Sequence, residues 1–188
     1  MQIKMLAANL LGAALLVAPF TPAAAFTLSS PDIKSGGKVP KNFEFNGFGC
    51  AGDNKSPALK WSGAPKGTKS FAVTVYDPDA PTGSGWWHWM VINIPPDVSE
   101  LPGNAGAANS ASLPKGAMQN RIDFGVNAFG GVCPPQGDKP HRYIFTVYAL
   151  KTDKLEVPGD ATAALTGFMI NGNSLGKASF TATYGRAK

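Results

Sequence analysis

Apolar runs that end at prolines are the feature that most limits how this chain can fold. The run at residues 71–76 (FAVTVY) is β-branched and aromatic, and it stops just before Pro78, which cannot donate a hydrogen bond to a strand ladder. A second run at 89–94 ends at Pro95, and a third follows at 143–150. None of the three has a helical period. They predict three central strands of a sheet.

Shorter elements surround these strands. A helix is expected to begin with Asp160 as its N-cap. Its buried face would hold Leu165, Phe168 and Met169, which recur at helical spacing. The stretch at 100–119 is rich in Ala, Gly, Ser and Asn, which indicates a long surface loop. Because the sequence has no internal repeat, we expect a single, all-β dominated domain. Further short strands are expected at 26–30, 43–46, 59–61 and 179–184.

The first 25 residues have the three parts of an export signal. Lys4 supplies a positive start, residues 5–17 form an apolar core, and alanines at 23–25 provide a small-residue cleavage site. The apolar core is too short to remain as a membrane anchor, which takes about 20 residues. We therefore expect residues 1–25 to be cleaved, and residues 26–188 to form one domain that is periplasmic or secreted.

Charge and apolar length limit the classes of partner. Removing Lys4 from the 17 basic residues leaves 16 against 12 acidic ones. This surplus is thinly spread and includes no tight basic run, so we expect no nucleic-acid partner. Lysines in the N-terminal third could attract an anionic membrane surface, but a solvated lysine-rich face is the simpler explanation. No later apolar run reaches the length of a transmembrane anchor.

The chain has two cysteines, Cys50 and Cys133. An even pair in an exported protein predicts a disulfide. The spacing alone cannot show that the two residues meet, and the alternative is two buried free thiols.

Two polar stretches next to the central strands contain both of the chain's histidines. They are residues 77–89 (DPDAPTGSGWWHW) and residues 133–143 (CPPQGDKPHRY). If the strand at 71–76 pairs with an antiparallel neighbour on each side, the two stretches meet at one end of the sheet. The alternation of side chains along a strand then places His141 and Tyr143 on the same face. The groups that would share this rim are Asp77, His88, His141 and Tyr143.

These groups are suited to a phosphate-like anion. Two imidazoles, a phenol and the backbone N–H groups of Gly/Pro-rich loops can all donate hydrogen bonds to it. Neighbouring aspartates would fix the histidine tautomers and raise the histidine pKa values. The Ala80-Pro81 bond is a candidate for a cis peptide. The prolines that would stiffen the pocket walls are Pro78, Pro81, Pro134 and Pro135.

Each of these residues also has alternatives. His88 could be a core histidine that donates to a backbone carbonyl, and Asp77 could form an Asx turn. A metal site made of these two residues and His141 would lack a closely spaced ligand pair. Residues 83–85 (GSG) do not have the spacing of a serine nucleophile elbow. Cys133 is better explained as a disulfide partner than as a thiol nucleophile.

The same stretches resemble the two signature regions of the phosphatidylethanolamine-binding, or Raf kinase inhibitor-like, family. DPDAP at 77–81 followed by HW at 88–89 is similar to the first region, and CPP…HRY at 133–143 is similar to the second. The resemblance extends over nearly the whole chain after the expected cleavage site. The signal peptide indicates an exported, YbcL-like member of the bacterial YbhB/YbcL branch. Three further stretches resemble this branch: NKSPALKW at 54–61, GSGWWHWMVINIP at 83–95 and DFG at 123–125.

The resemblance implies a large antiparallel sheet packed on a smaller one, with Greek-key connections and a few peripheral helices. It also implies a small pocket for a phosphate-type anion, and it implies neither a metal nor an organic cofactor. Arg142 is one residue out of phase with the pocket and should face away, where it would anchor the loops. Carried over by motif, the anion-binding residues are Asp77, Asp79, His88, Pro134, His141 and Tyr143.

We therefore expect a non-enzymatic binding protein whose partner is a small phosphate-bearing anion or a phospholipid headgroup. The alternative is a protein-recognition regulator, such as a protease inhibitor or a signalling modulator, that uses Trp86 and Trp87 on the pocket rim. A homodimer is also compatible with the sequence. The chain departs from the animal members because their long C-terminal helix is not recognisable, so their ligand preference and kinase regulation do not carry over.

Overall fold

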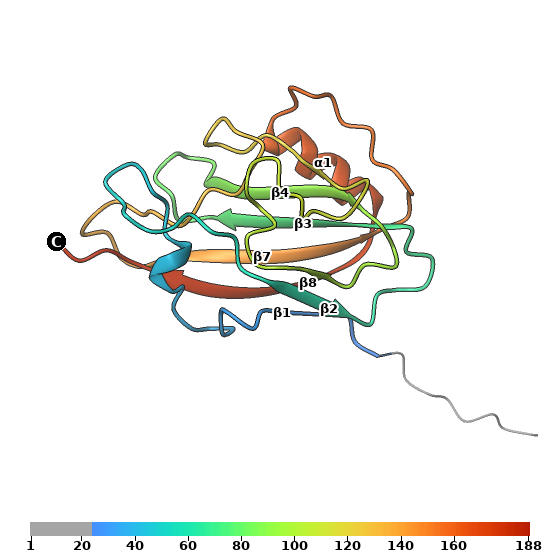
Figure 1. Ribbon diagram of the computed structural model, residues 1–188, viewed down its shortest axis with the longest axis horizontal. Helices are drawn as coiled ribbons and strands as arrows, with labels where there is room; N and C mark the ends of the chain where they lie inside the picture. The colour runs from blue at the N-terminus through green and yellow to red at the C-terminus, as the bar shows by residue number, and fades with distance from the viewer. Residues whose placement is uncertain (1–23) are drawn as a thin grey trace, which may run out of the picture.

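Two antiparallel sheets and one α-helix make up the computed structural model, which describes residues 24–188 (Figure 1). The large sheet has the strand order β6-β4-β3-β7-β8, and the small sheet has the order β1-β2-β5. The β-dominated fold predicted from the sequence is confirmed. The elements are β1 (Thr27–Ser29), the 3-10 helix η1 (Lys41–Phe43), β2 (Leu59–Ser62), β3 (Ser70–Asp77), β4 (Trp86–Ile94), β5 (Glu100–Leu101), β6 (Met118–Gln119), β7 (His141–Leu150), α1 (Ala163–Asn173) and β8 (Ser174–Tyr184).

The strand order of the large sheet is a Greek key. Strands β3, β4 and β6 lie side by side in chain order, and a long connection then returns the chain so that β7 lies on the other side of β3. Both neighbours of β3 pair with it in antiparallel fashion. The predicted pairing is therefore confirmed. It places the beginnings of β4 and β7 at the same end of the sheet as the last residues of β3.

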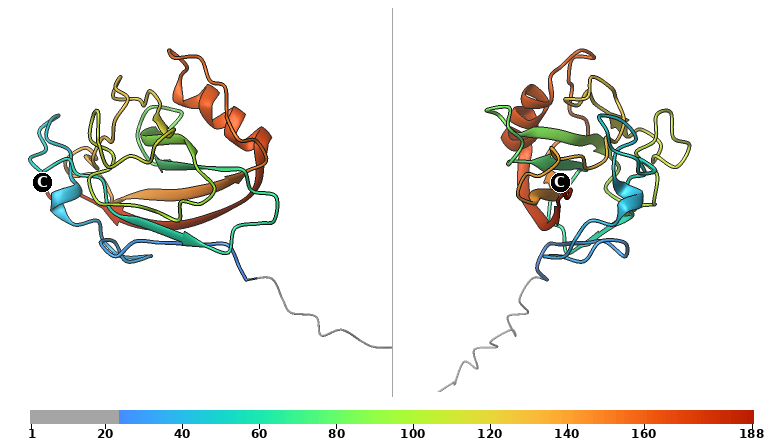
Figure 2. Two further views of the ribbon diagram at one scale, coloured as in Figure 1. Left: turned by 45° about the vertical axis from the view of Figure 1, so that its right-hand side comes forward. Right: turned by 90° about the vertical axis from the view of Figure 1, so that its left-hand side faces the viewer.

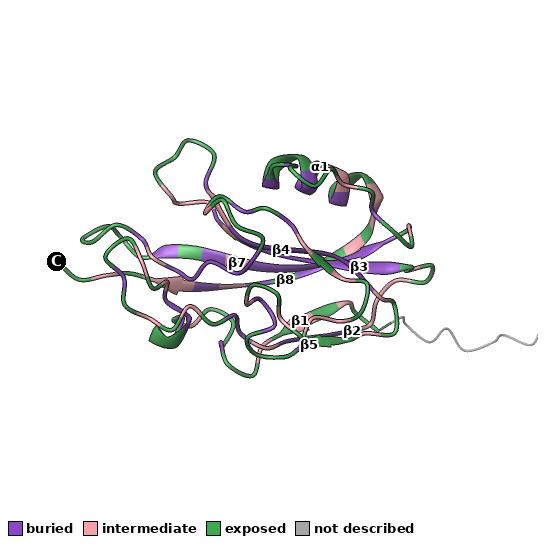
Figure 3. Cartoon of the chain, turned by 45° about the horizontal axis from the view of Figure 1, so that its top comes forward, coloured by how far each residue is buried: buried purple, intermediate pink, exposed green. Residues whose placement is uncertain are grey.

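Apolar side chains fill both faces of β3, which explains its nearly unbroken apolar run. On one face, Val73 and Val75 pack in the core between the two sheets. On the other face, Ala72 packs in a second cluster that includes Ile170 of α1. Helix α1 and the small sheet accordingly lie on opposite sides of the large sheet (Figures 2 and 3). The molecule thus has three layers. The candidate site lies at one end of the central layer, where polar side chains follow the strands.

The helix begins later than predicted and buries a different face. Its N-cap is Thr162, whose hydroxyl accepts a hydrogen bond from the Leu165 N–H at 3.2 Å, so the prediction of Asp160 was wrong. Leu165 and Phe168 are 42% and 75% exposed. The buried residues are instead Ala163, Thr166, Gly167 and Ile170. This face is mostly small, so the helix backbone can lie close to Trp87 and Met90 of β4.

Two other expectations need correction. The stretch at 43–46 is not a strand, because the chain there leaves η1 and makes a single bridge between Glu44 and Val132. The loop at 100–119 begins and ends with strand residues, which form β5 and β6. Both are two-residue strands, too short to produce a periodic pattern in the sequence.

The expected signal peptide, residues 1–25, falls almost wholly outside the described part of the chain. Residues 24–188 contain no helix that is long and apolar enough to cross a membrane.

Candidate functional site

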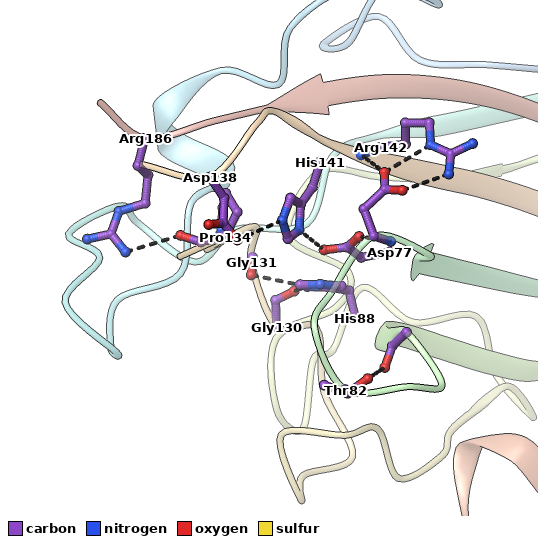
Figure 4. Close-up of polar contacts among 12 residues, drawn as sticks. Asp77, Thr82, His88, Gly130, Gly131, Pro134, Asp138, His141, Arg142 and Arg186 are labelled. Atoms are coloured by element: carbon purple, nitrogen blue, oxygen red, sulfur yellow. Dashed lines mark hydrogen bonds and ion pairs between the residues drawn. The ribbon is translucent and has the colours of Figure 1, made fainter. Parts of the chain in front are cut away.

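Side chains from β3, β4 and β7 surround a cavity of about 160 Å³ at one edge of the large sheet. Asp77 is the last residue of β3, His88 lies near the start of β4, and His141 and Tyr143 lie at the start of β7. All four side chains line the cavity, together with Pro134 from the loop before β7. The structure thus brings together five of the six predicted pocket residues. Figure 4 shows four of them: Asp77, His88, Pro134 and His141.

Asp77 uses its two carboxylate oxygens for different tasks. Oδ2 accepts a hydrogen bond from Nδ1 of His141 at 2.8 Å, and Oδ1 accepts one from the backbone N–H of Asp79 at 2.8 Å. Asp77 and His141 are only 2% and 4% exposed, so the ion pair is shielded from water. Asp77 therefore both forms the turn and orients His141, two roles that the sequence left as alternatives. Because the Nδ1 proton of His141 points to Asp77, the second ring nitrogen is the one left for a ligand.

His88 is held by backbone carbonyls and not by Asp77, which corrects the expectation. Its Nδ1 donates to the carbonyl oxygens of Gly130 at 2.8 Å and Gly131 at 3.1 Å. Burial lowers the pKa of the ring, and the nearby carbonyls and Asp77 only partly oppose this effect. The expected rise in its pKa was therefore wrong. In the neutral ring, the other nitrogen, Nε2, is a hydrogen-bond acceptor.

Tyr143 carries a buried hydroxyl that makes no hydrogen bond of standard geometry among residues 24–188, although the Asp77 carboxylate and the Cys133 backbone lie close enough to affect its pKa. The side chain is fully buried, and its ring packs edge-on against His88 with centroids 5.2 Å apart. Burial, reinforced by the negative charge of Asp77, raises the pKa of the phenol, so the hydroxyl keeps its proton at neutral pH. Trp61 Nε1 and Asn120 Oδ1 are also buried and unpaired, but only the Tyr143 hydroxyl belongs to a residue that lines the cavity.

Asp79 does not line the cavity, although the sequence placed it there. Its carboxylate accepts two hydrogen bonds from the guanidinium of Arg142, at 2.9 and 2.7 Å, and a third from the Arg142 backbone N–H at 2.8 Å. The guanidinium of Arg142 lowers the pKa of Asp79 to about 2. Arg142 faces away from the cavity and ties the loop after β3 to the start of β7, as the sequence analysis expected.

The predicted disulfide between Cys50 and Cys133 is present, and it joins two loops at the cavity mouth. Arg186 reinforces this junction from the C-terminal tail. Its guanidinium donates to the carbonyl oxygen of Pro134 at 3.3 Å (Figure 4) and to that of Gly49 at 2.6 Å. The loops that form the cavity wall are therefore joined both by the disulfide and by the hydrogen bonds of Arg186.

The wall after β3 is stiffened by proline in the trans form. Residues 24–188 contain no cis peptide bond, so the suggestion of a cis Ala80-Pro81 bond was wrong. A tight turn still forms there, because the Thr82 N–H donates to the Ala80 carbonyl at 2.8 Å.

Sequence reasoning missed the aromatic part of the wall. Phe124 contacts Trp86 and His88 edge-on, with ring centroids 5.4 and 5.3 Å apart, and it stacks on Phe48. The DFG stretch was a sequence signal for Phe124 as a pocket residue. Asp123 of that stretch accepts a hydrogen bond from the Trp87 N–H at 2.8 Å and so fixes the loop that carries Phe124. Nothing in the local sequence around Phe48 marked it as a pocket residue.

Asp138 is a second acidic neighbour that the sequence analysis did not select. Its carboxylate lies 3.6 Å from Nε2 of His141, the ring nitrogen that Asp77 leaves free. Among residues 24–188 no group of three or more His, Cys, Asp or Glu residues is arranged to hold a metal ion. The cavity therefore presents imidazole nitrogens and a phenol hydroxyl, next to carboxylates that are already engaged with histidine.

Comparison with known proteins identifies the fold and its family. The family model for phosphatidylethanolamine-binding proteins matches residues 29–185. This chain belongs to that family. Among curated relatives of this phosphatidylethanolamine-binding protein, YbcL of Escherichia coli K12 is 57% identical over 162 residues, which cover 86% of this chain and 88% of YbcL. YbhB of the same strain is 50% identical over 157 residues, covering 84% and 98%.

Solved structures support the same assignment. The crystal structure of E. coli YbcL, described as a new member of the mammalian PEBP family, aligns with a TM-score of 0.84 at 56% identity and covers 86% of this chain and 99% of its own. CT736 of Chlamydia trachomatis aligns with a TM-score of 0.71 at 30% identity, covering 86% and 98%. The family resemblance found in the two signature regions is confirmed.

Proposed function

We propose that this member of the family is a non-enzymatic binding protein whose cavity takes a phosphate-type anion, such as the phosphoethanolamine headgroup. The observation that carries the proposal is that the Tyr143 phenol and both histidines line one cavity, where the phenol makes no hydrogen bond of standard geometry to residues 24–188. A phosphate oxygen is a strong acceptor and would give this donor a well-placed partner.

The protonation of the cavity fits a phosphate monoester that still carries one proton. His88 is neutral at pH 7, because burial lowers its pKa, and its Nε2 can accept a hydrogen bond from a P–OH group. Tyr143 can donate to one of the other oxygens. Protonation of Nε2 of His141 would add a charged donor, with Asp77 balancing the charge from behind.

No serine or free thiol lines the proposed site, and the Asp77 carboxylate is already bonded to His141. The cavity wall includes Cys133, but this sulfur is bonded to Cys50. The only hydroxyls among the lining residues belong to Tyr143 and Thr82. The Tyr143 phenol keeps its proton because its pKa is raised, and Thr82 donates its own to the carbonyl of Gly85 at 2.5 Å. These features support binding over turnover.

Calorimetry with inorganic phosphate and phosphoethanolamine tests the proposal. We expect millimolar or tighter binding by the wild-type protein. The His88→Ala, His141→Ala double variant should bind at least about a hundred-fold more weakly, since two hydrogen bonds to a charged group are lost at about 1.5 kcal/mol each.

Lys69→Ala serves as the control, because this exposed side chain precedes the start of β3, at the far end of the strand from Asp77, and should leave ligand affinity nearly unchanged. Failure of the wild-type protein to bind either ligand at millimolar concentration would overturn the proposal. So would equal affinity in the wild type and the double variant, provided that both are folded.

We further propose that residues 26–188 are the mature domain, exported to the periplasm. Support comes from the first residues of the fold. The ring of Phe26 packs on Phe71 with centroids 6.3 Å apart, and β1 starts at the next residue, so a cut after Ala25 would leave the core complete. Intact-mass analysis of the periplasmic fraction should find a chain that begins at Phe26. A full-length chain confined to the cytoplasm would contradict this.

A further inference from the structure

Phe48 is held in an unusual conformation at the mouth of the cavity. Its side chain is 72% exposed, and its backbone φ is 54°, in the left-handed region that bulky side chains rarely adopt. Such a conformation costs about 1 kcal/mol or more and persists only where the surroundings enforce it. The disulfide at Cys50 and the hydrogen bond from Arg186 to the Gly49 carbonyl fix the chain immediately after Phe48. The fold therefore maintains an exposed aromatic ring at this position.

The ring of Phe48 stands between two hollows. It stacks on Phe124 with ring centroids 5.9 Å apart and planes inclined by 12°, and Phe45 packs beside it at 5.3 Å. Phe48 and Phe124 line the anion cavity on one side and a second hollow of about 430 Å³ on the other. We call the second hollow the aromatic groove. Its apolar wall consists of Phe45, Phe48, Phe124, Val126, Ala128 and Phe129.

Two of the four polar side chains that line the aromatic groove, Asp53 and Asn54, are engaged with the protein itself. The amide of Asn54 donates to the Phe129 carbonyl at 3.4 Å and accepts from the Gly131 N–H at 2.7 Å. Asp53 forms an ion pair with Lys55 at 3.4 Å. A peptide backbone needs a donor or acceptor at each residue, and among these four side chains it would find only Asn46 and Asn104 unengaged. Hydrocarbon needs none and would gain from covering the aromatic rings.

The small size of the anion cavity points in the same direction. At about 160 Å³ it has room for a small headgroup such as phosphoethanolamine but not for an alkyl chain as well, so a longer chain on the phosphate must leave through the mouth. Phe48 stands at that mouth and leads into the aromatic groove.

We propose that the aromatic groove is a second subsite, which holds the alkyl chain of an amphiphilic phosphate ester whose phosphate lies in the anion cavity. Phe48 is the residue that sets the preference for an apolar chain. The inference rests on the proposed function of the cavity, but it adds a distinct prediction: affinity depends on chain length, and that dependence passes through Phe48.

The test is calorimetry with inorganic phosphate and with ethyl, butyl and hexyl phosphate. Each methylene that reaches the groove should tighten binding by up to about fourfold. In Phe48→Ala this gain should shrink to less than twofold for each added ethylene unit, whereas the affinity for inorganic phosphate should stay within about threefold of the wild type. Phe48→Leu, which remains apolar, should retain most of the chain-length dependence.

Phe168→Ala is the matched control. This phenylalanine is 75% exposed on α1 and lines neither hollow, so its loss should leave the whole series unchanged. Thermal unfolding of each variant establishes that it is folded before its affinities are compared.

The outcomes separate the two proposals. If the wild type binds no phosphate at all, the proposed function itself fails. If inorganic phosphate binds but chain length has no effect, or the effect is equal in Phe48→Ala, the second subsite is overturned. If a phosphoserine peptide with a neighbouring leucine binds more tightly than hexyl phosphate and depends on Phe48, the groove takes a peptide and the alkyl chain is the wrong occupant.

Discussion

At the residue scale, protonation in the cavity is governed by burial more than by neighbouring charge. His88 is close to Asp77, yet desolvation is the larger effect and lowers the pKa of the imidazole. Desolvation also raises the pKa of the Tyr143 phenol. Both residues are therefore uncharged at neutral pH.

This has a measurable effect on stability. The pKa of His88 is lowered in the fold from an ordinary value of 6.5, so the unfolded chain binds the proton first as the pH falls. The free energy of unfolding should decrease below about pH 6.5, by up to about 1.4 kcal/mol per pH unit, until the pKa of the folded state is reached. Urea unfolding of the wild type and His88→Gln from pH 7.5 to 5 checks this. The variant should show a shallower slope, and parallel slopes would contradict the assignment.

Residues that share a strand could be placed from sequence, and residues held by loops could not. The two-residue alternation put His141 and Tyr143 on one face, and the end of β3 put Asp77 beside them. The carbonyl partners of His88 lie more than 40 positions away, on a glycine loop with no periodic pattern. Asp79 was wrongly predicted to line the cavity, because the family motif does not show that its carboxylate forms hydrogen bonds with Arg142.

At the scale of elements, strands buried on both faces were predictable from composition, but the helix was misread. The sequence suggested that its largest apolar residues would face the core. In fact Leu165 and Phe168 face outward, and the buried face combines Ile170 and the partly buried Met169 with small residues. The small residues, Gly167 among them, let α1 lie close to β4. The strand proposed at 43–46 was wrong because Phe43 ends η1 and packs in the core between the sheets, whereas Phe45 packs on Phe48 and Phe124.

The corrected helix start gives a matched pair of variants. Thr162→Ala removes the hydroxyl that accepts from the Leu165 N–H and should cost about 1 kcal/mol of unfolding free energy. Asp160→Ala, at the position expected from sequence, should change it by less than about 0.5 kcal/mol. Urea unfolding at pH 7 measures both, and the reverse order of losses would show that the helix starts at Asp160.

At the scale of the whole molecule, the disulfide connects parts that are distant in the chain. It joins residues separated by 83 positions, and the loop it closes contains β2 to β6. The family fold could be anticipated from two short signatures because the Greek key brings both to one edge. Sequence alone did not predict that the same edge would also gather the disulfide and the C-terminal tail.

Removing this cross-link should destabilise the whole domain. Closing so long a loop restricts the unfolded chain, so the Cys50→Ser, Cys133→Ser double variant should lose up to about 4 kcal/mol of unfolding free energy.

The same double variant should lose the loop geometry around Phe48. This loss should weaken binding of alkyl phosphates more than binding of inorganic phosphate. Chemical denaturation and the same calorimetric series measure the two effects. A variant as stable as the oxidised wild type would contradict the first.

The attachment of the C-terminal tail has a practical consequence for anyone who purifies this protein. Arg186 is bonded at the cavity mouth, and Lys188 packs close to Gly137 in the loop before β7. The C-terminus thus lies at the cavity end of the large sheet, whereas the described chain begins at the opposite end (Figure 1). An affinity tag or fluorescent fusion after Lys188 would crowd the ligand entrance and distort binding data. A tag placed between Ala25 and Phe26 would avoid that entrance.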